Sequence, residues 1–201
     1  MTFYPDDAPV PVELRTDDLV LRMLGPDVVE PDYEAVMETR VRLRAWSNSD
    51  WPTDDFTLAG NLDDMQMHER EHLAREAFAF TVLSADESRV EGCCYFRPLG
   101  GLLKRREFVA REGQEPLSDS VATVSFWVRD SALPRDLDRQ LLGGLARWLA
   151  EDWPFERAVF LTNDSQTRDH QTLRDMGLPQ VATLRSKDSG LNWQLWDIPP
   201  R

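Results

Sequence analysis

"VATVSFWVRDSALPRDLDRQLLGGLARWLA" is the stretch from Val121 to Ala150, and it joins two segments of different periodicity. Its first part, Val121–Val128, is rich in β-branched and aromatic residues and predicts a buried strand. Its last part repeats apolar residues at helical spacing, which predicts an amphipathic helix with one buried stripe. That stripe contains Leu137, Leu141, Leu145, Trp148 and Leu149. A strand, a loop and a helix in this order are typical of an α/β domain.

The segments on either side continue the alternation of strands and helices. A long stretch, Gly100–Ser120, exceeds what a hairpin needs, and we expect it to be an inserted or mobile loop. The predicted order β-α-α-β-β-β-α-β-α-β-β indicates one domain over residues 1–201. Helices are predicted at residues 31–46, 58–76, 137–150 and 167–176, and strands at 17–24, 77–83, 89–99, 121–128, 157–163, 181–186 and 191–198.

Composition limits the class of protein and its partners. The 201 residues carry a formal net charge of −13, which disfavours binding to nucleic acid or to an anionic membrane. No window is apolar enough to span a membrane, and the N-terminus lacks the pattern of a signal peptide. The two cysteines, Cys93 and Cys94, are adjacent on a predicted strand, so their side chains point to opposite faces and a disulfide between them is not expected. We therefore expect a cytoplasmic protein.

The element order and three motifs together resemble the GNAT superfamily of acetyl-CoA-dependent N-acetyltransferases. LRTDDLVLRML followed by PDYEAVM is similar to the branch that includes ribosomal-protein acetyltransferases. SFWVRD with RQLLGGLARWL resembles the cofactor-binding strand, loop and helix, and FLTNDSQTRDHQTLRDMGL resembles the strand and helix that follow. The resemblance implies a GNAT-type α/β fold, a mixed central sheet flanked by helices, and transfer of an acetyl group from acetyl-CoA to an amine. It also implies a homodimer, paired through sheet edges and the late strands.

The resemblance further implies where the cofactor binds. Two central strands diverge, the pantetheine arm lies between them, and free N–H groups of a loop at a helix N-terminus bind the diphosphate. Backbone N–H groups of Trp127 and Val128 are the implied catalytic groups, because they would polarise the thioester carbonyl. The implied cofactor-binding residues are Phe126, Trp127, Val128, Arg135, Asp136, Leu137, Asp138, Arg139, Gln140 and Asn163.

The cofactor loop departs from the family pattern at two positions. By ungapped alignment, Asp136 and Asp138 stand where glycine or another small residue is usual. A carboxylate beside a diphosphate costs about 1 kcal/mol in water and several times more in a partly buried site, and Asp138 also suits the N-cap of the helix. The usual positions of the catalytic base and acid hold Thr123 and Leu173, and leucine cannot donate a proton. These departures favour an alternative function, a catalytically inactive GNAT-fold binding or interaction protein.

The segment after the first predicted helix combines acidic and aromatic residues. By resemblance this junction lines the acceptor pocket, and an acidic, aromatic rim suits a cationic amine carried by a small molecule or peptide. An ordinary N-cap and turn explains the same residues without any ligand. The predicted acceptor residues are Trp46, Asp50, Trp51, Asp54 and Asp55.

One further motif, HEREH, matches the zinc-protease pattern H-E-x-x-H. On a helix, His68 and His72 would share a zinc ion, with Glu69 as general base. Two charged residues lie between Glu69 and His72, and His170 is the only other histidine available as a third ligand. A solvated helix face, with Glu71 and Arg75 paired at i,i+4, accounts for the motif without a metal. We therefore expect no metal, and by resemblance this helix covers the acceptor cleft.

Overall fold

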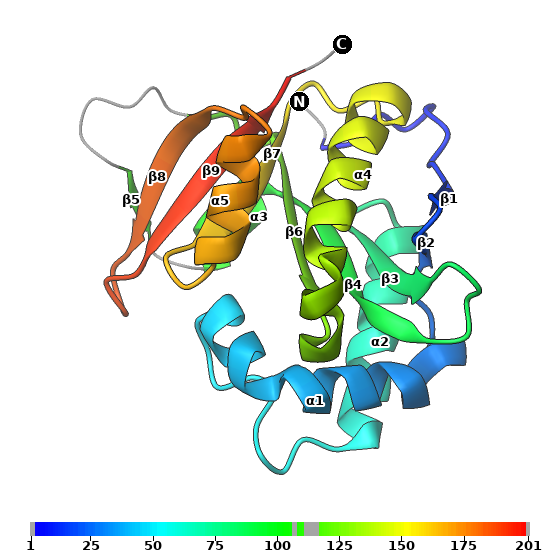
Figure 1. The fold of residues 1–201 in the computed structure, drawn as a ribbon. Coiled ribbons are helices and arrows are strands. Elements are labelled where there is room, and N and C mark those ends of the chain that lie inside the picture. Colours follow the sequence, from blue (N-terminus) through cyan, green and yellow to red (C-terminus); the bar gives the residue numbers. More distant parts are fainter. Residues whose placement is uncertain (1–2, 106–107, 111–116, 200–201) are drawn as a thin grey trace.

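The computed structural model describes residues 3–105, 108–110 and 117–199. Its centre is one nine-stranded sheet in the order β1-β2-β3-β4-β6-β7-β9-β8-β5 (Figure 1). All neighbouring strands are antiparallel except β6 and β7, which are parallel. The sheet is therefore mixed, as predicted. The strands are β1 (Glu13–Arg15), β2 (Leu19–Met23), β3 (Phe78–Ser84), β4 (Val90–Pro98), β5 (Phe108–Ala110), β6 (Ala122–Val128), β7 (Ala158–Asn163), β8 (Gln180–Ser186) and β9 (Asn192–Ile198).

Helices cover both faces of this sheet (Figure 1). The stripe predicted on α4 is confirmed, because all five of its residues are buried in the core cluster on that face. On the other face, Val36, Leu43 and Met65 from two helices pack with Trp127 of β6. Among the residues described, no helix is long and apolar enough to cross a membrane. The helices are α1 (Val29–Ser47), α2 (Leu58–Leu73), α3 (Leu99–Arg105), α4 (Leu137–Asp152) and α5 (Thr167–Asp175), with short 3-10 helices η1 (Pro26–Val28) and η2 (Asp130–Arg135).

The stretch between β4 and β6 differs from the predicted loop. It begins with α3 and then adds β5 to the edge of the sheet beside β8, with Val109 opposite Arg185. Residues 106–107 and 111–116 of this stretch lie outside the described residues. The prediction of a loop was wrong because a three-residue strand has too short a pattern to be recognised.

The two parallel strands at the centre are paired over only part of their length. The register runs from Ala122 opposite Ala158 to Val124 opposite Phe160. Beyond these residues β6 continues to Val128 and β7 to Asn163 without further pairing. Strands twist relative to one another, so two strands that stop pairing diverge. Their carboxyl-terminal ends therefore leave an opening in the sheet, close to the start of α4.

Candidate functional site

The opening between β6 and β7 exposes a defined set of backbone groups. The N–H of Arg129 donates to the carbonyl of Glu91 on β4 at 2.7 Å. In an antiparallel pair the hydrogen-bonded residues alternate, so Trp127 is also bonded to β4, opposite Cys93. The backbone groups of Phe126 and Val128 point the other way, into the opening. The predicted catalytic role of the Trp127 amide is thus corrected, because its N–H is hydrogen-bonded within the sheet. The N–H of Val128 is available.

This opening forms a crevice of about 240 Å³. It contains four of the predicted cofactor residues, Phe126, Trp127, Val128 and Asp138. The other wall comes from the start of α5 and from α1, which passes beneath the lower ends of α4 and α5 in Figure 1. The remaining lining residues are Arg42, Ala45, Trp46, Leu133, Ser165, Gln166, Thr167, Arg168 and Asp169.

The start of α4 lies at one end of the crevice and is occupied by an ion-pair cluster. Arg168 of α5 donates from Nε and Nη2 to the Asp138 carboxylate and from Nη2 to the Asp136 carboxylate. The same Nη2 donates to the carbonyl of Leu133 at 3.2 Å. Asp136, with a left-handed φ of 56°, is the N-cap residue, and its side chain makes no capping hydrogen bond. The predicted N-cap role of Asp138 is therefore wrong, because its carboxylate is bonded to Arg168 instead.

Five other predicted cofactor residues lie outside the crevice. Leu137 is buried in the core, and Gln140 is exposed. Arg135 donates to the buried carboxylate of Glu91 at 2.8 Å, and Arg139 donates to Asp175 at 3.1 Å. Asp136 is exposed and does not line the crevice, although its carboxylate accepts a hydrogen bond from Arg168. Of the predicted loop residues only Asp138 lines the crevice, because the other side chains lie in the core, are exposed or are bonded to neighbouring carboxylates.

Asn163 is fully buried and serves the fold. Its amide nitrogen donates to the carbonyls of Ala45 at 3.0 Å and Trp46 at 2.8 Å, at the end of α1. Its oxygen accepts from the backbone N–H and the hydroxyl of Ser165. Because both ends of the side chain are used, the predicted approach of Asn163 to a cofactor arm is corrected. It joins the end of β7 to α1 and so holds the two walls of the crevice together.

Arg42 was missed by the sequence reasoning and lies on the α1 side of the crevice. Its guanidinium donates to the carbonyl of Val128 and, at 2.7 Å, to Asp130 after β6. The helix period gave no signal for this residue, since a solvent-facing arginine is ordinary. The contact confirms that the backbone of Val128 faces away from β4.

Asp169 lines the same crevice in a half-buried position. Burial raises the pKa of this carboxyl from 3.8 to about 6, although its oxygen accepts a hydrogen bond from Gln166 at 2.8 Å. The ionised carboxylate is therefore held in the folded state at a cost in free energy.

Replacing Asp169 with asparagine is expected to stabilise the protein in a pH-dependent way. The folded pKa is raised, so the contribution of Asp169 to wild-type stability is fully present below about pH 4 and is lost as the pH rises through about 6. Asparagine keeps an acceptor for Gln166 and removes the charge. Chemical denaturation should give a gain of about 1–3 kcal/mol at pH 7.5 and none at pH 4. Asp188→Asn, in an exposed turn, is the matched control; an equal gain in both variants would contradict the assignment.

A second and larger cavity, of about 470 Å³, lies between α1, α2 and the sheet. Trp46 lines this acceptor-side cavity and also the crevice, so one side chain borders both. Thr123 and Ser125 of β6 form part of its floor. Thr123, at the family's base position, donates its hydroxyl to the carbonyl of Arg97 at 2.8 Å. It is therefore a structural residue, as is Leu173, which is completely buried.

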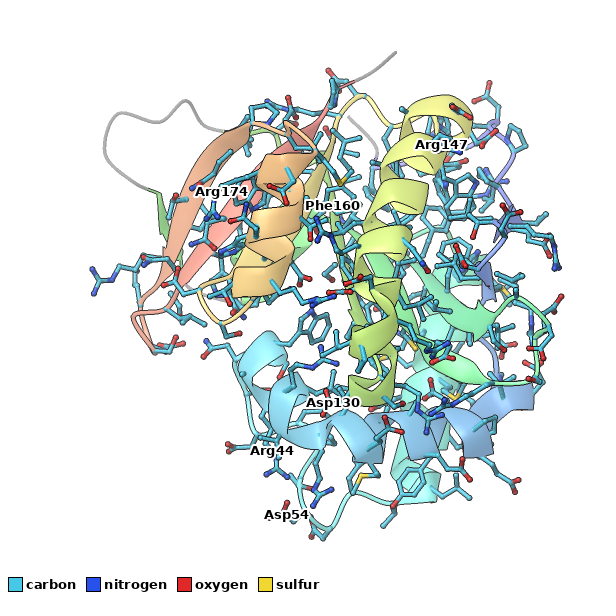
Figure 2. The ribbon with its side chains drawn as sticks, viewed as in Figure 1. Arg44, Asp54, Asp130, Arg147, Phe160 and Arg174 are labelled. Carbon is cyan, nitrogen blue, oxygen red and sulfur yellow. The ribbon has the colours of Figure 1, made fainter. Side chains whose placement is uncertain are left out.

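The predicted acceptor residues divide into two groups. Trp46 and Trp51 line the acceptor-side cavity, whereas Asp50, Asp54 and Asp55 do not. Asp54 accepts from Arg44 at 2.6 Å, and Figure 2 shows this pair below α1, away from the sheet. The prediction that these aspartates supply the acidic rim was wrong, because the turn after α1 directs them to the surface. The carboxylates of the cavity come from the helices instead.

Two of these carboxyl groups carry raised pKa values. Asp32 is 3% exposed, and burial raises the pKa of its carboxyl. It accepts from the amide of Asn61 at 2.9 Å and from the thiol of Cys93 at 3.2 Å. Burial also raises the pKa of Asp64, which accepts from the indole N–H of Trp51 at 3.2 Å. In the part of the chain that the structure describes, neither is paired with a lysine or arginine.

The third carboxylate of the cavity, Glu71, is ionised, and its charge is already balanced by a neighbouring arginine. Hydrogen bonds from His68 and then Arg97 lower its pKa to about 2, against the opposing effect of burial. Arg97 approaches in a fork, with Nη1 at 3.2 Å and Nη2 at 2.9 Å from the two oxygens. The predicted pairing of Glu71 with Arg75 is wrong, since Arg75 bonds to backbone carbonyls near the N-terminus.

The two histidines of the HEREH motif do not form a metal pair. His72 is buried against Phe78 and Phe80, and its Nδ1 lies 3.1 Å from the carbonyl of Ala79. His68 is bonded to the Glu71–Arg97 pair. Glu69 is not among the lining residues of the acceptor-side cavity. Among the described residues no group of three potential metal ligands is found, and the zinc-protease interpretation has no geometry to support it.

Comparison with solved structures identifies the architecture. No protein-family model matches the sequence, and a search of curated proteins finds no match. RimL, a ribosomal L7/L12 alpha-N-protein acetyltransferase in complex with coenzyme A, has a TM-score of 0.69 at 14% identity, covering 92% of this chain and 96% of that one. The chain has the GNAT acetyltransferase fold.

Two further structures with the GNAT fold agree. A putative ribosomal-protein-serine acetyltransferase from Vibrio cholerae has a TM-score of 0.68 at 16% identity and full coverage of both chains. MccE, a microcin C7 self-immunity acetyltransferase in complex with acetyl-CoA and AMP, has a TM-score of 0.68 at 10% identity, covering 90% of this chain and 92% of that one. At these identities the likeness establishes the GNAT fold alone. The opening between β6 and β7 is then the place in this fold where the family pattern puts the thioester arm.

Proposed function

We propose that the protein transfers an acyl group from a thioester, acetyl-CoA in the simplest case, to a primary amine. One observation carries this proposal: the crevice, which holds the free N–H of Val128, and the acceptor-side cavity share Trp46 as a lining residue. An acyl donor in the first and an amine in the second would be held against each other at the point where β6 and β7 diverge. Bringing two reactants together in this way supplies much of the acceleration in such reactions.

The chain's own groups account for the proton and charge movements. A thioester supplies an activated acyl group on a good leaving thiol. The N–H of Val128 faces the crevice and is placed to donate to the carbonyl oxygen as negative charge develops there. The bound ammonium first gives one proton to a carboxylate of the acceptor-side cavity, which frees the lone pair of the nitrogen. The C–N bond then forms and the C–S bond breaks; the nitrogen loses a second proton, and the leaving thiolate takes up one.

The acceptor we propose is cationic when it binds. Asp32 and Asp64 are carboxyl groups without a cationic partner among the described contacts, and Trp46, Trp51 and Tyr95 wall the same cavity. Carboxylates and aromatic faces together favour an ammonium group. Because the pKa of Asp64 is raised, this carboxylate is a better proton acceptor than an ordinary aspartate.

The test is a transfer assay with two carriers, acetyl-CoA and S-acetylpantetheine. The acceptors are a diamine, an amino sugar and a peptide with a free N-terminus, and the product is followed by release of free thiol and by mass spectrometry. Transfer should be saturable in carrier and acceptor, and Trp46→Ala should lower kcat/KM by more than about tenfold. Absence of both transfer and carrier binding in a folded protein would refute the proposal.

Replacing Asp64 with asparagine should lower kcat/KM for a cationic acceptor by about 10- to 100-fold. Asparagine can still accept from the indole of Trp51, so the wall of the cavity is kept. The acidic limb of the pH–rate profile, set by this raised pKa, should move or disappear. Asp63→Asn is the matched control, because Asp63 precedes Asp64 on α2 and its side chain is exposed. An equal loss of kcat/KM in both variants would show that the effect comes from removing any negative charge on α2, and not from Asp64 in particular.

A second function, an inactive binding protein with the GNAT fold, is favoured by the Arg168 cluster at the start of α4. The two functions separate in the same assay, because an inactive protein would show no transfer with either carrier. A homodimer and a cytoplasmic location stay predictions, and light scattering on the purified protein checks the first of them.

A further inference from the structure

The start of α4 does not fit a diphosphate. In the family pattern this end of the helix presents free N–H groups to the anion, with small residues that allow close approach. Here Asp138, only 3% exposed, and Asp136 place two carboxylates at the same end. The guanidinium of Arg168 is bonded to both of them and to the carbonyl of Leu133. The position is therefore filled by the protein's own charges.

The balance of charge around the crevice is also unfavourable for an anion. Each of its two arginines is already paired: Arg42 with Asp130, and Arg168 with Asp136 and Asp138. Asp169 adds a further carboxyl on the crevice wall, ionised above about pH 6. The lining itself holds two carboxyl groups, Asp138 and Asp169, and two guanidinium groups. Each guanidinium is also paired with a carboxylate outside the lining, Asp130 or Asp136, so a diphosphate would meet two carboxyl groups and no arginine of the lining that is free to bind it.

The part of the crevice along β6 has the opposite character. It offers the backbone of Phe126 and the N–H of Val128, together with the uncharged side chains of Trp46 and Leu133. These groups suit the amides and methylenes of a pantetheine arm. The crevice, at about 240 Å³, is also smaller than the roughly 300–1,000 Å³ typical of sites that enclose a drug-sized ligand.

We propose that the acyl donor of this protein is a thioester on an uncharged pantetheine-type arm, without a nucleoside diphosphate at its far end. The inference rests on the proposed acyl transfer, and it assigns Asp136, Asp138 and Arg168 a role in selecting the donor. The arm lies along β6, and the ion-pair cluster closes the end at which coenzyme A would place its diphosphate.

Calorimetric titration of the intact protein with S-acetylpantetheine and with acetyl-CoA tests the proposal. The wild type should bind S-acetylpantetheine at least as tightly as acetyl-CoA. Asp136→Gly with Asp138→Gly should tighten acetyl-CoA by about tenfold or more and change S-acetylpantetheine by less than about twofold. Glu151→Gln with Asp152→Asn removes two carboxylates from the other end of α4 and should alter neither affinity by more than about twofold.

Salt supplies a second readout that does not require the double variant to fold. Repulsion between like charges is screened by ions, so acetyl-CoA should bind the wild type more tightly at about 0.5 M than at about 0.05 M salt. Wild-type binding of acetyl-CoA tenfold tighter than S-acetylpantetheine, or weakened by salt, would overturn this inference and leave the proposed acyl transfer intact. Failure of both carriers to bind would overturn the two together.

Discussion

Replacing Val128 with proline should lower the rate of acyl transfer by about 100- to 1,000-fold while the protein stays folded. Removing one backbone donor to a developing oxyanion has a cost of this size. The N–H of Val128 faces the crevice and takes no part in the β4–β6 ladder, so proline removes a donor without breaking a sheet hydrogen bond. Val128→Ala keeps the N–H and should retain activity within about fivefold. Steady-state kinetics and thermal unfolding are measured on the same preparations.

Trp127→Pro is the matched comparison. Its N–H lies on the β4 side, opposite Cys93, so proline at this position removes a ladder hydrogen bond in a central strand. We expect a loss of about 3 kcal/mol or more in the free energy of unfolding, or failure to fold. If Trp127→Pro folded and Val128→Pro did not, the assigned alternation of hydrogen bonds along β6 would be reversed. Val128 would then have no free N–H for the proposed mechanism.

Replacing Gly92 with alanine should destabilise the protein by about 3 kcal/mol or more. An added Cβ would lie 2.0 Å from the carbonyl oxygen of Trp127 and 2.8 Å from the Cα of Val128. Both are backbone atoms, so the overlap is relieved only by moving β4 away from β6. Such a shift would also reorient the backbone of Val128, and we expect activity to fall with stability. Urea unfolding at equilibrium gives the free energy directly.

Gly143→Ala is the control for that substitution. An added Cβ there meets nothing within 4 Å, and the residue lies inside α4, where alanine is favoured over glycine by about 1 kcal/mol. The same change of glycine to alanine should therefore stabilise at one position and destabilise at the other. If Gly92→Ala left the free energy of unfolding unchanged, β4 and β6 would have to separate more easily than their packing indicates.

Much of the fold follows from local patterns. The apolar stripe of α4, the two helices before β3 and the late strands each repeat at their own period within one segment, so the order of elements was predictable. β1, α3 and β5 were missed, since each has fewer residues than a periodic pattern requires. The sequence also showed two aspartates where the family loop has small residues, which is the departure on which the donor proposal depends.

The composition of the site was less predictable, because its groups come from segments far apart in the chain. Asp32 and Asp64 each look like an ordinary helix-surface residue, and only the packing of α1 and α2 on the sheet turns them into one cavity. Asp50, Asp54 and Asp55 had the stronger local signal, yet the turn directs them to solvent. A buried carboxyl and an exposed one have the same sequence signature when burial depends on a distant neighbour.

By itself the sequence determined which of the longer segments are strands and helices, which face of α4 is buried, and that the loop before it is acidic. Tertiary structure alone decided that β6 and β7 stop pairing after Val124 and Phe160, that Val128 and not Trp127 offers its N–H, and that Arg168 neutralises the acidic loop. The physical reason is one of range. Periodicity is written in neighbouring residues, whereas strand register and ion pairs depend on segments that meet only when the chain is folded.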